Sequence, residues 1–250
     1  MNRLTLRRAA LTALGLAAFA AAPAHAQDAT PPASPAADEA ADDGGFDISA
    51  TLTLVSDYRF RGVSLTNRDP AGQASVDISY HGFYAGAWTS NIARFADTHD
   101  ELDLYAGYGG EIRGFEYQVG AIAYLYPGGD GTGNVYEATG EFSYTLGPAT
   151  GRLKVNYAPD QHNLAGDNLY LSADLRVAIP TTPITAFAQI GRERGSFYGR
   201  KTDWSFGAEF TQGPFTASLG WFDTDLDAAS IGLPRRSTRG GIVASLGFEF

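Results

Sequence analysis

The last eleven residues of the chain, 240–250, alternate between two kinds of side chain with a period of two. One face is apolar throughout: Ile242, Ala244, Leu246, Phe248 and Phe250. The other face is mostly small or polar: Gly241, Val243, Ser245, Gly247 and Glu249. Because successive side chains of a β-strand point to opposite faces, this pattern predicts a strand between an apolar solvent and a wetter one. Such a strand with an unpaired edge would aggregate, so we expect it to close a barrel.

The same alternation recurs from Phe46 onward in twelve segments, and the first strand is expected to continue to Arg61. Longer connections are expected at 62–72, 91–100, 127–134, 158–167, 191–201 and 223–239. Short turns are expected between them, at 81–82, 109–114, 147–151, 180–183 and 212–214. Outer-membrane barrels have short periplasmic turns and longer extracellular loops. The sequence therefore predicts an all-β, transmembrane antiparallel barrel of about 12 strands, with both termini in the periplasm.

Composition agrees with strands as the membrane-spanning elements. The mean hydropathy is -0.16 and 44% of the residues are hydrophobic, with 30 Gly, 13 Tyr and 15 Phe. After residue 26 no apolar run reaches the ~18 residues that a spanning helix needs. A soluble β-sandwich would also give many short strands. Its outer face should be rich in Lys and Glu, whereas the polar face here carries mainly Ser, Thr, Tyr, Asp and Glu, and we therefore favour the barrel.

The N-terminal region predicts export. Residues 1–26 contain three arginines, an apolar run from Ala9 to Ala22 and a small-x-small site at Ala24-His25-Ala26, which together indicate a cleavable signal peptide. Its removal leaves 15 cations against 28 acids, a net charge of -13. The chain has no Cys, so disulfides and Cys-ligated metals are excluded. Residues 27–45 hold five acids and no cation, which predicts a disordered periplasmic leader, with a tether to a partner as the alternative.

The polar face of the predicted strands is strongly acidic. Twelve acids and five bases fall on it, an excess of seven negative charges, and dry burial of such charges would cost several kcal/mol each. We therefore expect a narrow, water-filled, cation-preferring pore. The residues predicted to line it are Asp57, Arg59, Arg61, Asp77, Glu101, Asp103, Glu116, Glu137, Glu141, Arg152, Lys154, Asp174, Arg176, Asp203 and Glu209, with Asp47 and Glu249 completing the acids. Six aromatic residues are expected to occlude it partly: Tyr84, Trp88, Tyr105, Tyr124, Tyr126 and Tyr170.

Two stretches near the N-terminus carry a family resemblance. Residues 56–66, Ser-Asp-Tyr-Arg-Phe-Arg-Gly-Val-Ser-Leu-Thr, and residues 82–91, Gly-Phe-Tyr-Ala-Gly-Ala-Trp-Thr-Ser-Asn, resemble the signature of the TorF family of porins from proteobacteria. Leu65 stands where that family pattern has a polar residue, often Gln. The resemblance implies an outer-membrane barrel with no agreed substrate. Leu246, Phe248 and Phe250 likewise resemble the C-terminal signal that the barrel-assembly machinery reads.

Three features of the predicted outer loops could carry other chemistry. His99 beside Asp100 suggests a hydrolase or protease at the barrel rim, but no activated serine motif or metal-spaced histidine pair accompanies them. The glycine-rich run 127–134 lacks the Lys of a phosphate loop and the several acids of a calcium loop, so it predicts a flexible hairpin loop. Seven cations in the last two outer loops could contact lipopolysaccharide phosphates, gather anionic solutes or simply be solvated: Arg192, Arg194, Arg200, Lys201, Arg235, Arg236 and Arg239.

The sequence thus predicts a porin in the outer membrane of a Gram-negative bacterium, which passes small hydrophilic solutes by passive diffusion. No catalysis, cofactor, metal or nucleic-acid partner is expected. The expected partners are outer-membrane lipid and lipopolysaccharide, the barrel-assembly machinery and the solutes themselves. A rim hydrolase and a non-conducting structural or adhesion barrel are the alternatives, and oligomeric state is left open.

Overall fold

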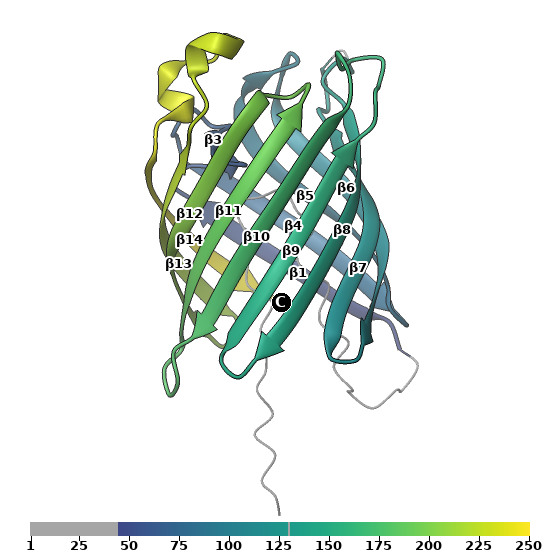
Figure 1. Ribbon diagram of the computed structural model, residues 1–250, viewed down its shortest axis with the longest axis vertical. Coiled ribbons are helices and arrows are strands. Elements are labelled where there is room, and N and C mark those ends of the chain that lie inside the picture. Colours follow the sequence, from purple (N-terminus) through teal and green to yellow (C-terminus); the bar gives the residue numbers. More distant parts are fainter. Residues whose placement is uncertain (1–44, 130) are drawn as a thin grey trace, which may run out of the picture.

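The computed structural model describes residues 45–129 and 131–250, which form a closed barrel (Figure 1). Residues 1–44, with the predicted signal peptide and nearly all of the predicted leader, lie outside the described residues. The wall strands are β1 (Asp47–Val55), β4 (Ala71–Tyr80), β5 (Phe83–Phe95), β6 (Thr98–Ile112), β7 (Phe115–Leu125), β8 (Val135–Leu146), β9 (Ala149–Ala158), β10 (Asn168–Ala178), β11 (Ile184–Gly195), β12 (Gly199–Gln212), β13 (Phe215–Thr224) and β14 (Gly241–Glu249). Each strand is antiparallel to its neighbours, and β1 pairs with both β14 and β4. The predicted barrel of twelve antiparallel strands is confirmed.

Side chains of the wall strands alternate between an exposed apolar outer face and a buried inner face, as the period of two in the sequence predicts. Large apolar side chains on the outer face are exposed, such as Leu54 at 67% and Ile242 at 66%, while Thr53 and Val243 on the inner face are buried. Aromatic pairs mark the end of the barrel where the short turns lie, with ring centroids 4.7 Å apart in Phe46–Tyr80, 4.9 Å in Phe83–Tyr108, 4.6 Å in Phe115–Tyr144 and 4.8 Å in Phe215–Phe248. Such an apolar band with an aromatic girdle is typical of outer-membrane barrels.

Short turns lie at the predicted places, but the predicted turns 109–114 and 147–151 are too long, because strand continues to Ile112 and begins again at Ala149. His81 and Gly82 join β4 to β5 with φ of 48° and 82°, and Arg113 and Gly114 join β6 to β7 with φ of 56° and 82°. Two consecutive positive φ values are what a two-residue hairpin turn needs to match the twist of its strands. Only glycine fits at position 82, because a Cβ there would lie 2.6 Å from the carbonyl oxygen of Gly109.

Two of the predicted outer loops are wrong. The predicted loop 91–100 is mostly strand, because β5 runs to Phe95, β6 starts at Thr98, and only Ala96 and Asp97 turn. The predicted loop 191–201 is also mostly strand, since β11 continues to Gly195 and β12 starts at Gly199. β5 and β6 therefore extend beyond their pairing with β4 and β7, whereas β11 stays paired with β10 up to Gly195.

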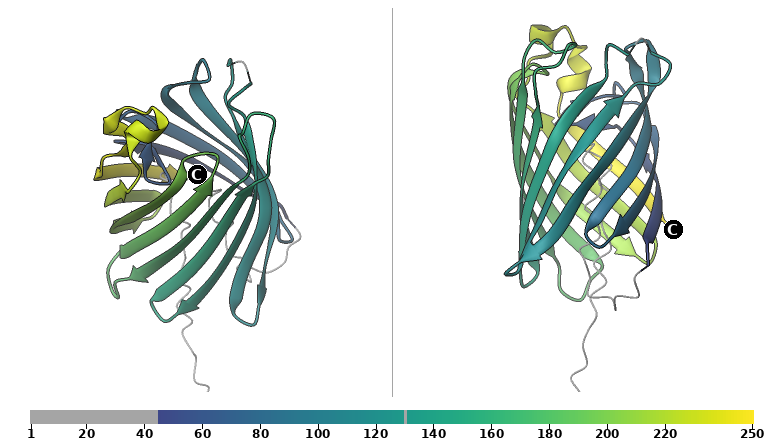
Figure 2. Two further views of the ribbon diagram at one scale, coloured as in Figure 1. Left: turned by 45° about the horizontal axis from the view of Figure 1, so that its top comes forward. Right: turned by 90° about the vertical axis from the view of Figure 1, so that its right-hand side faces the viewer.

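The predicted first strand is wrong at its outer end. The wall strand β1 stops at Val55, and residues 56–70 leave the wall instead of continuing it to Arg61. This stretch, called here the inserted segment, contains the small hairpin β2 (Arg59–Phe60) and β3 (Val63–Ser64). Figure 2 shows the dark-blue hairpin inside the barrel, next to the yellow 3-10 helices η1 (Ala228–Ile231) and η2 (Arg235–Thr238). β3 contacts η2 directly.

Within the part of the chain that the structure describes, no helix has the length and apolar character needed to cross a membrane.

Candidate functional site

The inserted segment is anchored to the wall by main-chain hydrogen bonds. The amide of Ser56 donates to the carbonyl of Ala244 at 2.9 Å, and the amide of Ala93 donates to the carbonyl of Leu65 at 2.7 Å. At the hairpin turn, a Cβ on Gly62 would lie 2.8 Å from the Cβ of Asp203, and its φ is 82°. Only glycine permits this backbone to lie so close to the wall.

Asp57 and Arg59 hold the segment together from within. The Asp57 carboxylate accepts from Arg59 Nε at 2.8 Å, from Ser64 Oγ at 2.6 Å and from Thr66 Oγ1 at 3.3 Å. Arg59 is fully buried and also donates to the carbonyl oxygens of Phe222 at 3.3 Å and Arg239 at 2.9 Å. With its donors used in this way, Arg59 fixes the segment against β13 and the loop after η2.

Arg61 reaches across to two distant strands. Its guanidinium donates to both oxygens of Glu137 on β8, at 2.9 and 2.7 Å, and to Glu193 Oε1 on β11 at 2.8 Å. The same group lies 4.3 Å from the ring centroid of Tyr170 and 4.5 Å from that of Phe60. Bidentate, charge-assisted bonds of this kind are directional as well as strong, so Arg61 sets where the segment sits in the lumen.

Glu193 and Lys201 complete this cluster, and the sequence analysis missed both as pore residues. Lys201 Nζ lies 3.1 Å from Glu193 Oε2 and 2.9 Å from Asp203 Oδ2, and it donates to the carbonyl oxygen of Arg61. Both side chains are fully buried, although 191–201 was predicted to be an outer loop that included Lys201 among its solvent-facing cations. The period-two continuation Gln189-Gly191-Glu193 was the signal that would have placed them inside.

A second set of ion pairs lies on the wall nearer the short turns. Glu141 on β8 faces Arg152 at 3.0 Å and Lys154 at 3.6 Å on β9, and Arg176 on β10 pairs with Glu209 on β12. These side chains alternate along their strands with lipid-facing residues, so they project into the lumen.

Two buried acids are different because they lack a cationic partner. Glu101 and Asp103 on β6 are each 1% exposed. Tyr58 Oη donates to Glu101 Oε1 at 3.2 Å, and burial raises the pKa of Tyr58 well above its usual range, which keeps it a neutral donor. Among the described residues, Glu101 Oε2 and both carboxylate oxygens of Asp103 have no hydrogen-bond partner.

All fifteen predicted pore-lining residues are on the inner side of the barrel. Twelve lie on the faces of the wall strands that also hold the buried residues, while Asp57, Arg59 and Arg61 lie on the inserted segment and not on strand one. Tyr84, Tyr105, Tyr124 and Tyr170 are buried on the same inner faces. Trp88 is half-buried and packs against Tyr58, with ring centroids 5.3 Å apart.

Glycines on the inner wall make room for the tyrosines. A Cβ on Gly86 would lie 2.6 Å from the ring and hydroxyl of Tyr105, and Tyr105 Oη donates to Asp77 Oδ1 at 2.5 Å. A Cβ on Gly191 would likewise clash with the hydroxyl of Tyr170. The rings therefore lie along the wall, which keeps them from filling the lumen.

The residues considered for a hydrolase do not form a site. His99 and Asp100 are exposed neighbours at the outer end of β6, where successive side chains point to opposite faces. Within residues 45–129 and 131–250, no group of three or more His, Cys, Asp or Glu side chains is arranged to hold a metal ion.

Comparison with known proteins identifies the family. The model of the family Gcw_chp, described as a bacterial protein of unknown function, matches residues 39–242. The chain belongs to this family. The comparison with curated protein sequences found no significant match. The Gcw_chp description thus gives no activity, and the TorF label predicted from the first strands is not among the findings.

Solved structures show what fold this Gcw_chp chain shares. The KdgM porin has a TM-score of 0.58 and 7% sequence identity, with 81% of this chain and 99% of that chain covered. The KdgM porin in complex with disordered oligogalacturonate has a TM-score of 0.54 and 7% identity, covering 81% and 97%. At such low identity the similarity concerns the fold, and the Gcw_chp chain has the barrel fold of these outer-membrane porins.

Proposed function

We propose that the protein is an outer-membrane porin through which small hydrophilic solutes diffuse passively, with cations favoured over anions. The main support for this proposal is the excess of acidic over basic side chains that face the lumen. Glu193, Lys201 and Glu111, which lies opposite the inward Glu116, add two acids and one base to the predicted inward set, giving fourteen acids and six bases. The six bases pair with six of the acids: Asp57, Glu137, Glu141, Glu193, Asp203 and Glu209.

Eight inward acids then have no ion-pair partner among the described residues: Asp47, Asp77, Glu101, Asp103, Glu111, Glu116, Asp174 and Glu249. Unpaired carboxylates need water or mobile cations around them. In a narrow lumen with low-dielectric walls, their field is focused along the pathway and raises the local concentration of cations. The inserted segment narrows this pathway, and its Arg59 and Arg61 are both paired with carboxylates.

Two independent lines support transport as the function. The KdgM structures, which share the fold, are described as porins. The sequence resemblance to the TorF family implies an outer-membrane porin as well. Neither line names a solute for this chain.

Reversal potentials in planar lipid bilayers test the proposal. The folded chain should conduct, and a KCl gradient should give a potential of the sign for K⁺ preference, most clearly near 0.01 M salt, where the Debye length is ~30 Å. Asp103→Asn combined with Asp174→Asn should reduce this preference. Asp100→Asn, at an exposed position on the outer rim, should not. A barrel without conductance would favour the structural or adhesion alternative, and an anion preference would contradict the charge argument.

The proposal includes contact with lipopolysaccharide on the outer wall. Arg194 and Arg200 lie directly opposite each other on β11 and β12, and both are exposed, as is Arg192. Like charges in a cross-strand pair destabilise the sheet unless an anion lies between them. Phosphate groups of the outer leaflet are suitable anions for such a guanidinium pair.

A further inference from the structure

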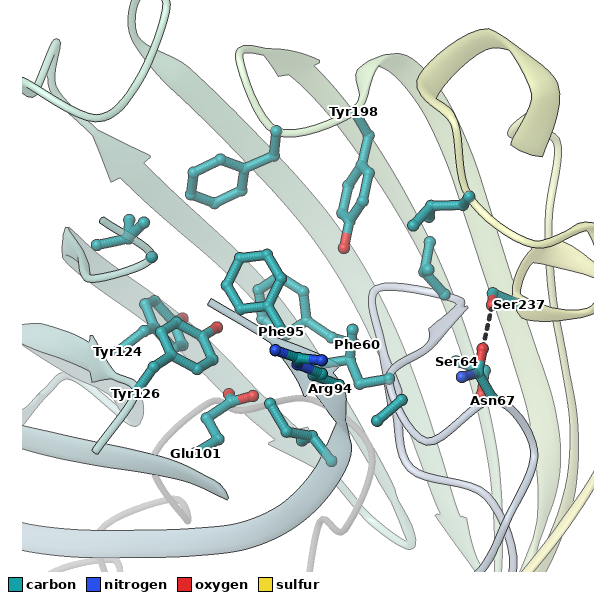
Figure 3. Close-up of a pocket in the computed structure, with 18 of the residues that line it drawn as sticks. Phe60, Ser64, Asn67, Arg94, Phe95, Glu101, Tyr124, Tyr126, Tyr198 and Ser237 are labelled. Carbon is teal, nitrogen blue, oxygen red and sulfur yellow. Dashed lines mark hydrogen bonds between the residues drawn. The ribbon is translucent and has the colours of Figure 1, made fainter. Parts of the chain in front are cut away.

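A cavity of about 460 Å³ opens on the outer side of the inserted segment. It lies between the inserted segment, the outer ends of β5 to β8, the turn before β12 and η2, and Figure 3 shows it with its lining residues. A hydrogen bond from Ser237 Oγ to Asn67 Oδ1 at 3.1 Å joins η2 to the inserted segment at its border. This cavity is called here the vestibule.

The vestibule is lined by aromatic rings from several elements. They are Phe60, Phe95, Tyr124, Tyr126, Phe197 and Tyr198. Phe95 and Tyr126 pack edge to face, with centroids 4.7 Å apart. Three other rings already lie near cations of the protein: Arg61 is 4.5 Å from the Phe60 centroid and 5.8 Å from that of Phe197, and Lys201 Nζ is 5.4 Å from that of Tyr198. Aromatic faces attract cations in this way.

Among the residues that the structure describes, the carboxylate that lines the vestibule is that of Glu101. Tyr124 lies opposite Asp103 in the register of β6 and β7, and Figure 3 shows Tyr124 and Tyr126 beside Glu101. Glu101 Oε1 accepts from Tyr58, while Oε2 has no hydrogen-bond partner among the described residues although the side chain is almost fully buried. A buried carboxylate oxygen without a donor costs free energy, and a bound cation would remove that cost.

The protein's own cations do not satisfy Glu101. Arg61 and Lys201 are held by Glu137, Glu193 and Asp203, so this cluster carries one negative charge in excess. Arg94 also lines the vestibule, but its side chain is 70% exposed and is ion-paired to Asp97 at 2.8 Å. The local field therefore favours a positively charged ligand.

We propose that the vestibule is a binding site for organic ammonium cations that carry apolar substituents, such as the trimethylammonium group. Aromatic rings around a buried carboxylate match both parts of such a group, the charge and the methyl surface. A bare divalent ion fits less well, because the described residues offer no cluster of three or more acidic or His ligands. The inference deepens the cation preference proposed above by naming a class of cation.

The deciding measurement is isothermal titration calorimetry on the full chain folded in detergent micelles. Choline is the probe, and 3,3-dimethylbutan-1-ol, which has the same shape without the charge, is the control ligand. Choline should bind at least about tenfold more tightly than the alcohol, because only the charged ligand gains from the aromatic faces and the carboxylate. Equal affinities, or no choline binding at all, would overturn the proposal without any variant.

Variants then locate the site. Glu101→Gln should weaken choline binding about tenfold or more, and Tyr126→Leu should weaken it by a similar factor. Glu111→Gln is the matched control, because Glu111 is an exposed acid on the same strand at the opposite end of the barrel. If Glu101→Gln does not fold, as judged by heat-modifiable migration, Tyr126→Leu decides alone. Unchanged affinity in both folded variants would place choline elsewhere and overturn the inference.

Calorimetry measures choline binding without requiring ions to pass through the barrel. The binding-site proposal and the porin proposal can therefore fail separately. Conductance without choline binding would overturn the vestibule site and leave the porin. Choline binding without conductance would support the vestibule and contradict the porin.

Discussion

Arg61 and Glu137, 76 residues apart in the sequence, meet in a bidentate ion pair inside the barrel. Arg61 comes from the inserted segment and Glu137 from β8, and both side chains are almost fully buried. Tyr124 Oη and Asn156 Nδ2 also donate to Glu137, at 2.9 and 3.2 Å, which leaves this carboxylate firmly oriented. This ion pair therefore ties the turn of the β2–β3 hairpin to β8, in addition to the main-chain bonds and the Arg59 contacts that hold the rest of the inserted segment.

Replacing Arg61 tests that conclusion. Arg61→Ala would leave Glu137 and Glu193 without their guanidinium, and removing one partner of a buried ion pair typically costs about 3–5 kcal/mol. We expect a lower unfolding temperature together with a larger single-channel conductance, because the segment loses its fixed position. Arg61→Lys should recover only part of both properties, since one ammonium nitrogen cannot span Glu137 and Glu193 as the two guanidinium nitrogens do. Unchanged conductance in Arg61→Ala would show that other contacts hold the segment.

Arg59 provides a contrast within the same hairpin. Its donors are used by Asp57 and by main-chain carbonyls, so Arg59→Ala should lower stability. The variant leaves the Asp57 carboxylate without its cation, but Asp57 is buried within the segment and keeps its hydrogen bonds from Ser64 and Thr66, so cation preference should rise only slightly. Thermal melting and reversal potentials on the same preparation separate the two effects. A shift in selectivity without a loss of stability would instead assign Arg59 to the ion pathway.

The close packing of the Tyr105 ring on Gly86 can be tested by adding a side chain at residue 86. Gly86→Ala should push the Tyr105 ring off the wall into the lumen and break its hydrogen bond to Asp77, so conductance and unfolding temperature should both fall. The double variant Gly86→Ala with Tyr105→Leu should recover stability, because the smaller side chain relieves the clash. Gly151→Ala is the control, as a Cβ there would meet nothing within 4 Å. Equal effects at the two glycines would contradict this account.

The terminal aromatic is expected to matter for assembly. The amide of Phe250 donates to the carbonyl of Ala50 at 2.9 Å, where the last strand meets the first. Phe250→Ser should reduce the yield of heat-modifiable barrel in the outer membrane and leave degraded or aggregated chain in the periplasm. Phe46→Ser is a matched control, since Phe46 and Phe250 are both 67% exposed but Phe46 lies at the start of β1. Similar yields for the two variants would argue against an assembly signal at the C-terminus.

Lipopolysaccharide should stabilise the barrel through the outer arginines. We expect purified lipopolysaccharide to raise the unfolding temperature in detergent, and Arg194→Ser with Arg200→Ser to remove most of that increase. Arg113→Ser, an exposed arginine in a turn at the opposite end, serves as the control. An increase that persists in the double variant would place the lipid contact elsewhere.

The barrel itself was predictable because one simple rule governs it. Each wall strand alternates between lipid and lumen, so residues such as Glu137 and Arg176 could be placed on the inner side from sequence alone. The inserted segment was not predictable in this way. Arg59 and Arg61 continue the alternation of β1, and what removes them from the wall is a set of long-range contacts to Phe222, Glu137 and Glu193. Periodicity carries no information about such contacts.

The wall hydrogen bonds do not depend on the inserted segment. Asp47–Val55 pairs with Ala71–Tyr80 in unbroken register, from Asp47 opposite Ser79 to Val55 opposite Ala71, so residues 56–70 begin and end at adjacent points on one rim. Sequence between these two points can be exchanged, lengthened or shortened while the cylinder around it stays the same. In this chain, the rim between Val55 and Ala71 is therefore the place where the aperture of the barrel can be altered without changing its lipid-facing surface.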